Sequence, residues 1–137
     1  PGNIPGKVVN TAMGKIGTLL CYDLRFPNLF RSLVKLGCKF IIVPAAFTVP
    51  TGKSHWQILL RSRAIENTSY IIAAAQCGVH HGSRKTYGHS IVVDPWGKIV
   101  LSGSEKPGIL STTLDLDLIN LVRSQIPSIY QNHTLLI

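Results

Sequence analysis

Short apolar runs, separated by turn residues and by two amphipathic segments, make up most of this chain. The runs at Ile16–Leu20, Phe40–Val43 and Tyr70–Ala75 have the length and composition of strands buried on both faces. Residues 27–37 and 54–67 instead repeat their apolar positions every three to four residues, which predicts helices. Because buried strands follow helices along the chain, the pattern predicts an α/β fold.

Weaker patterns predict the remaining elements. Gly37 is expected to end the first helix in the left-handed conformation. Ser54 with Gln57 has the form of a capping box. The second helix is therefore expected to begin at Ser54, after a loop at 45–53. Residues 79–85 are also expected to form a loop. The other expected elements are a strand at 8–12 that forms a hairpin with the first buried run, a strand at 87–94, a type I turn at Asp94–Gly97, a returning strand at 98–102, a strand at 109–114, and a last helix capped by Asp115 and ended by Pro127.

Cys21 lies where the first buried run ends and a sharp turn leads toward the helix that begins at Pro27. Backbone N–H groups and the helix dipole favour negative charge at such a place, including a tetrahedral oxyanion. A cysteine without further context is more often an inert buried thiol. The residues around it therefore decide between the two interpretations.

The segment Cys21–Pro27, CYDLRFP, resembles the nucleophile motif of the nitrilase superfamily, the carbon–nitrogen hydrolases that cleave amides and nitriles through a cysteine thioester. Further segments resemble that family in its order and spacing, from about Lys15 to about Asp117. Within the superfamily the chain is most similar to the deaminated glutathione amidase branch, including the amidase part of its fusions with a fragile-histidine-triad domain. The segments are Pro44–Phe47, His55–Trp56, Arg63–Asn67, Ala73–Gly78, His80–His81, Tyr87–Ser90 and Val93–Gly97.

The resemblance implies a four-layer αββα sandwich about twice as long as these 137 residues. In that family a glutamate base, a lysine and a second glutamate precede the cysteine. The 20 residues before Cys21 contain no acid, and both glutamates, Glu66 and Glu105, follow it. Residues 1–137 are therefore expected to be the C-terminal half of one such domain, with the tail at 127–137 left unassigned.

Cys21 is the expected nucleophile, and the backbone N–H of Tyr22 is the expected oxyanion donor from this half. Glu66 is a poor candidate for the base, because it lies on a helix surface several elements later. A papain-like pairing of Cys21 with His55 or His89 remains an alternative that spacing alone does not remove.

Four residues are candidates for binding the substrate. Phe47 and Thr48 follow the strand at 40–43, at the edge where α/β folds bind ligands, and Phe47 has an equally good interpretation as a core residue. His80 and Arg84 carry basic groups that suit a carboxylate. Simple solvation explains these two residues equally well.

Charge adds little to this picture. The formal net charge is +8, but the lysines and arginines are scattered and no aromatic residues are interleaved with them. We therefore expect no nucleic-acid partner. The resemblance implies instead a small-molecule amide as substrate and a homodimer or tetramer formed through the helices near 27–37 and 54–67.

Three cysteines without regular spacing favour a reducing compartment over a disulfide framework. We expect a cytoplasmic protein, with a mitochondrial location also compatible. His80, His81 and His89 have no cysteine or carboxylate at a zinc spacing, so neither a metal nor a cofactor is expected. No apolar run reaches the length of a membrane span, so no membrane partner is expected either.

These observations predict a cysteine-dependent amidase that releases ammonia from a small ω-amide such as deaminated glutathione, through a thioester at Cys21. An omega-amidase or another carbon–nitrogen hydrolase is the nearest alternative. The second alternative is a catalytically incomplete fragment that acts in dimerisation or interaction, and the isolated chain is expected to be inactive.

Overall fold

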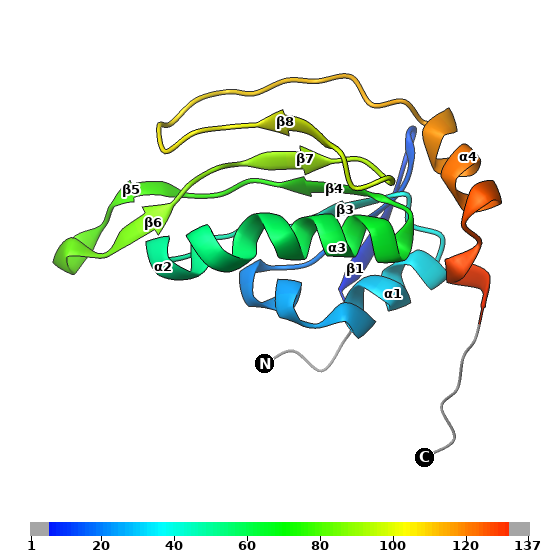
Figure 1. Ribbon diagram of the computed structural model, residues 1–137, viewed down its shortest axis with the longest axis horizontal. Helices are drawn as coiled ribbons and strands as arrows, with labels where there is room; N and C mark the ends of the chain where they lie inside the picture. The colour runs from blue at the N-terminus through cyan, green and yellow to red at the C-terminus, as the bar shows by residue number, and fades with distance from the viewer. Residues whose placement is uncertain (1–5, 132–137) are drawn as a thin grey trace, which may run out of the picture.

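The computed structural model describes residues 6–131, which form a mixed six-stranded sheet with most of the helices packed on one of its faces (Figure 1). Strands β2, β3 and β4 run parallel to one another, and the pairs β1–β2, β4–β7 and β7–β8 are antiparallel. In the order β1-β2-β3-β4-β7-β8 the strands are Lys7–Thr11, Gly14–Thr18, Phe40–Ile42, Tyr70–Ala73, Ile91–Val93 and Ile99–Ser102. The α/β layering and the opening hairpin expected from the sequence are confirmed.

Successive side chains along the strands point to opposite faces of the sheet, so that two apolar clusters form, one on each face. Ile41, Ile71 and Val93 face the helices and belong to the larger core. Their strand neighbours Phe40 and Tyr70 face the other way and pack with Ile119 of the last helix, α4, Asp117–Gln125. The larger core thus occupies the space between sheet and helices, where a half of an αββα sandwich places it.

Helix α1, Pro27–Lys35, follows the prediction closely. Proline stands at its first position, and Gly37 has a φ of +91°, the left-handed conformation expected after a helix C-terminus. The last helix is also as expected, because the side chain of Asp115 accepts a hydrogen bond from the N–H of Asp117 at 2.9 Å.

The second helix begins earlier than the sequence suggested, so the capping box at Ser54 is wrong. Helical structure starts with α2, Val49–Thr51, continues through a π-helical stretch at Gly52–Trp56 and becomes α3, Gln57–Asn67. Thr48 has the extended conformation of the residue before a helix. Gly52 permits this path, since a Cβ at that position would lie 2.3 Å from the Cβ of Tyr87. Close packing against another strand, rather than a local capping signal, sets the start of this helix.

Arg63 of α3 is buried although its side chain is charged. It is 6% exposed, its Nε donates to the carbonyl of Leu24 at 3.1 Å, and its guanidinium pairs with Glu66 at 3.0 Å. Arg63 thereby connects α3 to the turn that follows Cys21.

Three further expectations need correction. The segment 87–94 is not one strand, because Gly88 and His89 both have positive φ and separate β6, Lys85–Tyr87, from β7. The expected loop at 79–85 contains the turn of a small hairpin, in which β6 pairs with β5, Cys77–Val79. Residues 109–114 form no strand; they belong to an extended segment that returns from β8 to α4, with Ile109 almost fully exposed (Figure 1).

Candidate active site

Cys21 is the first residue of a short 3₁₀ helix, Cys21–Arg25, that follows β2. Its φ is +44°, in the left-handed region that residues other than glycine rarely adopt. The backbone N–H of Cys21 donates to the carbonyl of Pro44 at 2.9 Å, and the carboxylate of Asp23 accepts from the N–H of Leu20 at 2.8 Å. These two bonds hold the turn from either side.

The left-handed conformation costs an ordinary residue about 1–2 kcal/mol. Such strain persists only where surrounding contacts determine the conformation, and it is concentrated at functional sites. A reactive side chain on a sharp turn after a strand is exposed at the end of the sheet instead of being packed inside it. The geometry around Cys21 matches that arrangement.

The backbone N–H of Tyr22 lies between two N–H groups that already have acceptors. On either side of it, the N–H of Cys21 donates to Pro44 and the N–H of Asp23 donates to the carbonyl of Leu20. The N–H of Tyr22 lies in the first turn of the 3₁₀ helix, where backbone donors have no acceptor within the helix. The Tyr22 side chain itself is largely exposed.

Cys21 lines a cleft of about 500 Å³. The cleft lies past the carboxyl ends of β2, β3 and β4, the edge at which parallel sheets bind ligands. Its walls are mostly small and apolar, and the polar side chains that reach it are those of Cys21, Gln76 and Ser90. The full lining is Leu20, Cys21, Pro44, Ala45, Ala46, Ala74, Ala75, Gln76 and Ser90.

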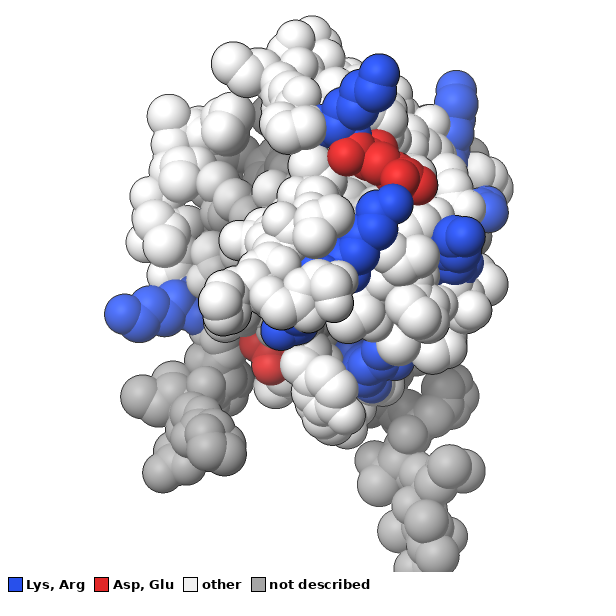
Figure 2. All heavy atoms as spheres, turned by 90° about the vertical axis from the view of Figure 1, so that its left-hand side faces the viewer, with Lys and Arg blue, Asp and Glu red and all other residues white. Residues whose placement is uncertain are grey.

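A second hollow of about 620 Å³ adjoins this cleft and shares Ala75, Gln76 and Ser90 with it. Its other side is formed by residues 103–110, where the chain leaves β8 and turns back. His80 and Lys106 are the basic residues of its lining. Figure 2 shows the neighbouring end of the molecule, where basic side chains are spread singly over the surface and acidic ones are few.

Phe47 and Thr48 lie near the cleft but do not line it. Phe47 is 7% exposed, and its ring packs against Trp56 with centroids 5.0 Å apart. The guanidinium of Arg25 lies 5.4 Å from the centre of the same ring. Thr48 shares a hydrogen bond of 3.0 Å with the hydroxyl of Thr51 in the first helical turn. The core interpretation of Phe47 therefore fits the structure better than a direct contact with substrate.

His80 and Arg84 lie on the small hairpin, at opposite ends of its turn. His80 lines the larger hollow, and its Nε2 lies 2.8 Å from the hydroxyl of Thr86. Arg84 is exposed and belongs to the lining of neither the cleft nor the hollow. The structure brings His80 toward the site and leaves Arg84 at its periphery.

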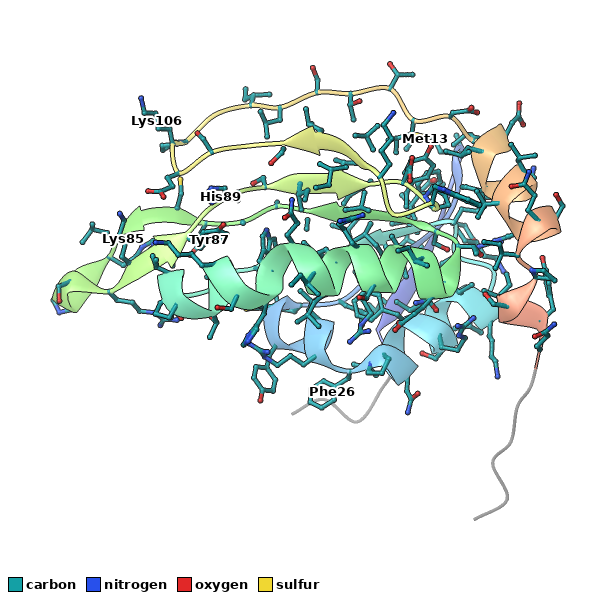
Figure 3. The ribbon with its side chains drawn as sticks, in the orientation of Figure 1. Met13, Phe26, Lys85, Tyr87, His89 and Lys106 are labelled. Atoms are coloured by element: carbon teal, nitrogen blue, oxygen red, sulfur yellow. The ribbon has the colours of Figure 1, made fainter. Side chains whose placement is uncertain are left out.

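None of the alternative partners for Cys21 lines the cleft. His55 lies 3.4 Å from the guanidinium of Arg25. His89 stacks on Tyr87, with ring centroids 4.0 Å apart, and its Nδ1 donates to the carbonyl of Tyr87 (Figure 3). Glu66 is paired with Arg63. The papain-like arrangement and the use of Glu66 as a base have no support in this geometry.

Gln76 and Ser90 lie within longer motifs of the sequence, but the sequence pattern assigned no role to either residue. The available signal for Gln76 was its place as the first polar residue after the apolar run Tyr70–Ala75. Ser90 had no such signal, because it reaches the cleft through the break between β6 and β7, which the sequence pattern did not show.

Within residues 6–131 no three histidines, cysteines or acidic residues cluster in a way that suits a metal ion. In the same part of the chain, no helix combines the length and apolar character needed to cross a bilayer.

Comparison with known proteins places these features in a family. A family model described as carbon–nitrogen hydrolase matches residues 1–124. The deaminated glutathione amidase of Bos taurus is 48% identical over 127 residues, which cover 93% of this chain and 39% of that protein. The chain thus spans about two fifths of the length of this curated relative.

Solved structures share the fold. The NitFhit protein of C. elegans aligns with a TM-score of 0.91 and 42% identity, over 96% of this chain and 32% of that one. A variant of an amidase from Nesterenkonia sp., in which the acetamide moiety of fluoroacetamide is covalently added at the active-site cysteine, aligns with a TM-score of 0.71 and 32% identity over 79% of this chain and 40% of that one.

Proposed function

The chain belongs to the carbon–nitrogen hydrolase family, and from that premise we propose that the protein is an amidase in which Cys21 attacks the carbonyl carbon of a small amide. The observation that carries this proposal is the position of Cys21, on a strained turn at the floor of an open, mostly apolar cleft. A nucleophile needs both access for the substrate and a fixed direction of attack.

The proposed reaction has two halves. The sulfur of Cys21 forms a bond to the amide carbon as the thiol proton passes to a base, and the negative charge on the oxygen is stabilised by the N–H of Tyr22. The carbon–nitrogen bond then breaks, and the nitrogen takes up a proton and leaves as ammonia. Water hydrolyses the resulting thioester, which releases the carboxylic acid and restores the thiol.

The base and the acid come from outside these residues in this proposal. No carboxylate or lysine lines the cleft among residues 6–131, and the family resemblance places a glutamate and a lysine earlier in the domain. The chain spans about two fifths of the length of its curated relative, so most of that relative lies outside the matched residues. The 137 residues alone are therefore expected to lack turnover.

The proposed substrate class is a small ω-amide, with deaminated glutathione as the first candidate because several relatives carry that name. An omega-amidase or another carbon–nitrogen hydrolase stays the alternative. Ammonia release by the whole protein from each candidate amide would separate them.

The decisive variant is Cys21→Ala in the whole protein, with Cys38→Ala as the matched control. We expect Cys21→Ala to abolish ammonia release and Cys38→Ala to retain it, because Cys38 lies in the core and lines neither the cleft nor the larger hollow. Ammonia release that persists in Cys21→Ala would refute the proposal. Trapping the acyl group on the tryptic peptide that contains Cys21, by mass spectrometry, would give the thioester directly.

We also propose that the protein forms a homo-oligomer through the helices near 27–37 and 54–67. Leu36, Ile58 and Ile65 are large apolar residues exposed on or next to these helices. Ile58→Lys is expected to lower the mass measured by light scattering. A lower mass for Val79→Lys, an exposed apolar residue on the distant hairpin, with no change for Ile58→Lys would contradict this interface.

A further inference from the structure

We propose that Gln76 and Ser90 form a subsite for a carbonyl or carboxylate oxygen of the substrate, between the amide that Cys21 attacks and the remainder of the substrate in the larger hollow. This inference rests on the proposed function and deepens it, because it names the chemical group that the site selects. Neither residue was assigned a role by the sequence pattern.

The two residues lie where the cleft and the hollow meet. The cleft and the larger hollow both include Ala75, Gln76 and Ser90 in their lining, so they form one continuous depression. A substrate whose amide reaches Cys21 and whose other end enters the larger hollow must pass these side chains. In a mostly apolar cleft, a few placed polar groups fix the orientation of a ligand.

Ser90 is set up to donate a hydrogen bond into the cleft. Its hydroxyl oxygen accepts the N–H of Ala75 at 2.9 Å. A hydroxyl that accepts from a backbone N–H still has its own hydrogen to donate. Among residues 6–131 that hydrogen has no acceptor. A ligand group that pairs with the hydroxyl hydrogen of Ser90 must therefore be a hydrogen-bond acceptor.

Gln76 has its main chain fixed and its side chain available. Its N–H donates to the carbonyl of Ala45 at 2.9 Å, and its carbonyl accepts from the N–H of Gly88 at 3.0 Å. The side-chain amide has no hydrogen-bond partner in the described part of the chain, and the residue is exposed at the mouth of the cleft. Its NH₂ group adds a second donor beside that of Ser90.

The backbone before Ser90 has an unusual conformation that surrounding hydrogen bonds hold. Gly88 and His89 have φ values of +68° and +61°, and only His89 carries a Cβ that makes this conformation costly. The carbonyl of His89 accepts the indole N–H of Trp56 at 2.8 Å, and the carbonyl of Ser90 accepts the N–H of Gly103 at 2.7 Å. Figure 3 shows Tyr87 and His89 side by side at this break between β6 and β7. Strain held by such bonds is typical of functional positions.

Two free donors that line the junction of the cleft and the larger hollow favour a ligand group that accepts hydrogen bonds. A carbonyl or carboxylate oxygen meets this requirement, whereas an alkyl chain would leave both donors unpaired. A ligand that covers these donors without accepting from them removes their contact with water, and we expect it to bind about tenfold more weakly. The subsite thus favours amides that carry an oxo or carboxyl group over simple alkyl amides.

The test compares two amides of equal length in the whole protein: succinamate, which carries a carboxylate, and butyramide, which does not. The ratio of their kcat/KM values is expected to fall about tenfold in Ser90→Ala and in Gln76→Leu. Ser90→Thr, which keeps the hydroxyl, should retain the ratio. Ser102→Ala is the matched control, because Ser102 lines neither the cleft nor the larger hollow.

A second measurement needs no turnover. Succinamate should slow the alkylation of Cys21 by iodoacetamide in the parent protein, and this protection should be about tenfold weaker in Ser90→Ala and Gln76→Leu. Equal ratios and equal protection in all variants would overturn the subsite. Absence of ammonia release from every amide, with protection intact, would instead refute the proposed function and leave the subsite standing.

Discussion

The backbone N–H of Cys21 donates a hydrogen bond to the carbonyl of Pro44 over 2.9 Å. This bond joins the chain leaving β2 to the chain leaving β3, at the edge of the sheet where the cleft opens. It also holds Cys21 at a φ of +44°. The candidate nucleophile therefore owes its backbone conformation to a contact with residues more than twenty positions away.

The strain at Cys21 gives a prediction about stability. Glycine adopts positive φ without the steric cost of a Cβ, so Cys21→Gly should unfold at a higher urea concentration than Cys21→Ala, by about 1 kcal/mol in the free energy of unfolding. The same pair at Cys38, whose φ is not positive, serves as control. There glycine should be the less stable of the two, and the same order at both sites would contradict the strain at Cys21.

Cys21 and Cys38 should react with iodoacetamide at different rates because their surroundings differ. Cys21 lies in the open cleft and is expected to react first, whereas Cys38 is completely buried in the core. Because burial raises the pKa of the Cys38 thiol, only partly opposed by Lys15, its thiolate is disfavoured as well. Peptide mapping after brief labelling should show modified Cys21 and unmodified Cys38. Labelling of Cys38 at the rate of Cys21 under native conditions would contradict this placement.

The same burial predicts how stability depends on pH. Burial raises the pKa of the Cys38 thiol above its ordinary value of 9.0 and that of the Tyr70 hydroxyl above 10.0. Above these ordinary values the unfolded chain loses protons that the folded chain keeps. The free energy of unfolding should therefore be fully present below about pH 9 and fall as the pH rises further.

Urea unfolding at about pH 8 and at about pH 10 measures this effect. Tyr70→Phe should reduce the loss between the two conditions, because phenylalanine has no proton to release. A midpoint that stays constant or rises with pH would show that neither group is protected as the structure indicates.

Local signals sufficed for the part of the fold around Cys21. The apolar run, the proline at position 27 and the glycine at position 37 predicted a strand, a turn and helix α1 in their observed order. Residues on both faces of β3 and β4 are buried, as their continuous apolar runs predicted.

Long-range contacts determine what the sequence pattern missed. The helix that leads into α3 starts at Val49 because Gly52 can approach Tyr87, and no local signal reports that approach. Ser90 reaches the cleft because the indole of Trp56 and the N–H of Gly103 hold a strained break between two strands. Gln76 and Ser90 meet only once β4 and β7 pair, so their convergence could not be derived from spacing.

Arg123 of α4 joins three separate parts of the chain, and its removal should destabilise the fold. Its Nε donates to the carbonyl and hydroxyl of Thr68, both at 3.3 Å, where α3 ends in a left-handed residue. Its Nη2 donates to the carbonyl of Cys38 at 3.3 Å and the hydroxyl of Ser69 at 3.1 Å, before β3 and β4 begin. Burial lowers the pKa of Arg123 below its ordinary value, partly opposed by Tyr130. The side chain still carries its charge at neutral pH.

The planar guanidinium makes these contacts in several directions at once, which neither lysine nor methionine can repeat. Arg123→Met should lower the free energy of unfolding by about 2–4 kcal/mol, because buried carbonyl and hydroxyl groups lose their donor. Arg123→Lys should lie between Met and the parent, since one ammonium can reach part of the set. Arg84→Met, at an exposed position, should change the value by less than about 0.5 kcal/mol. Equal urea midpoints for Arg123→Met and Arg84→Met would show that α4 is held by Ile119 and Val122 alone.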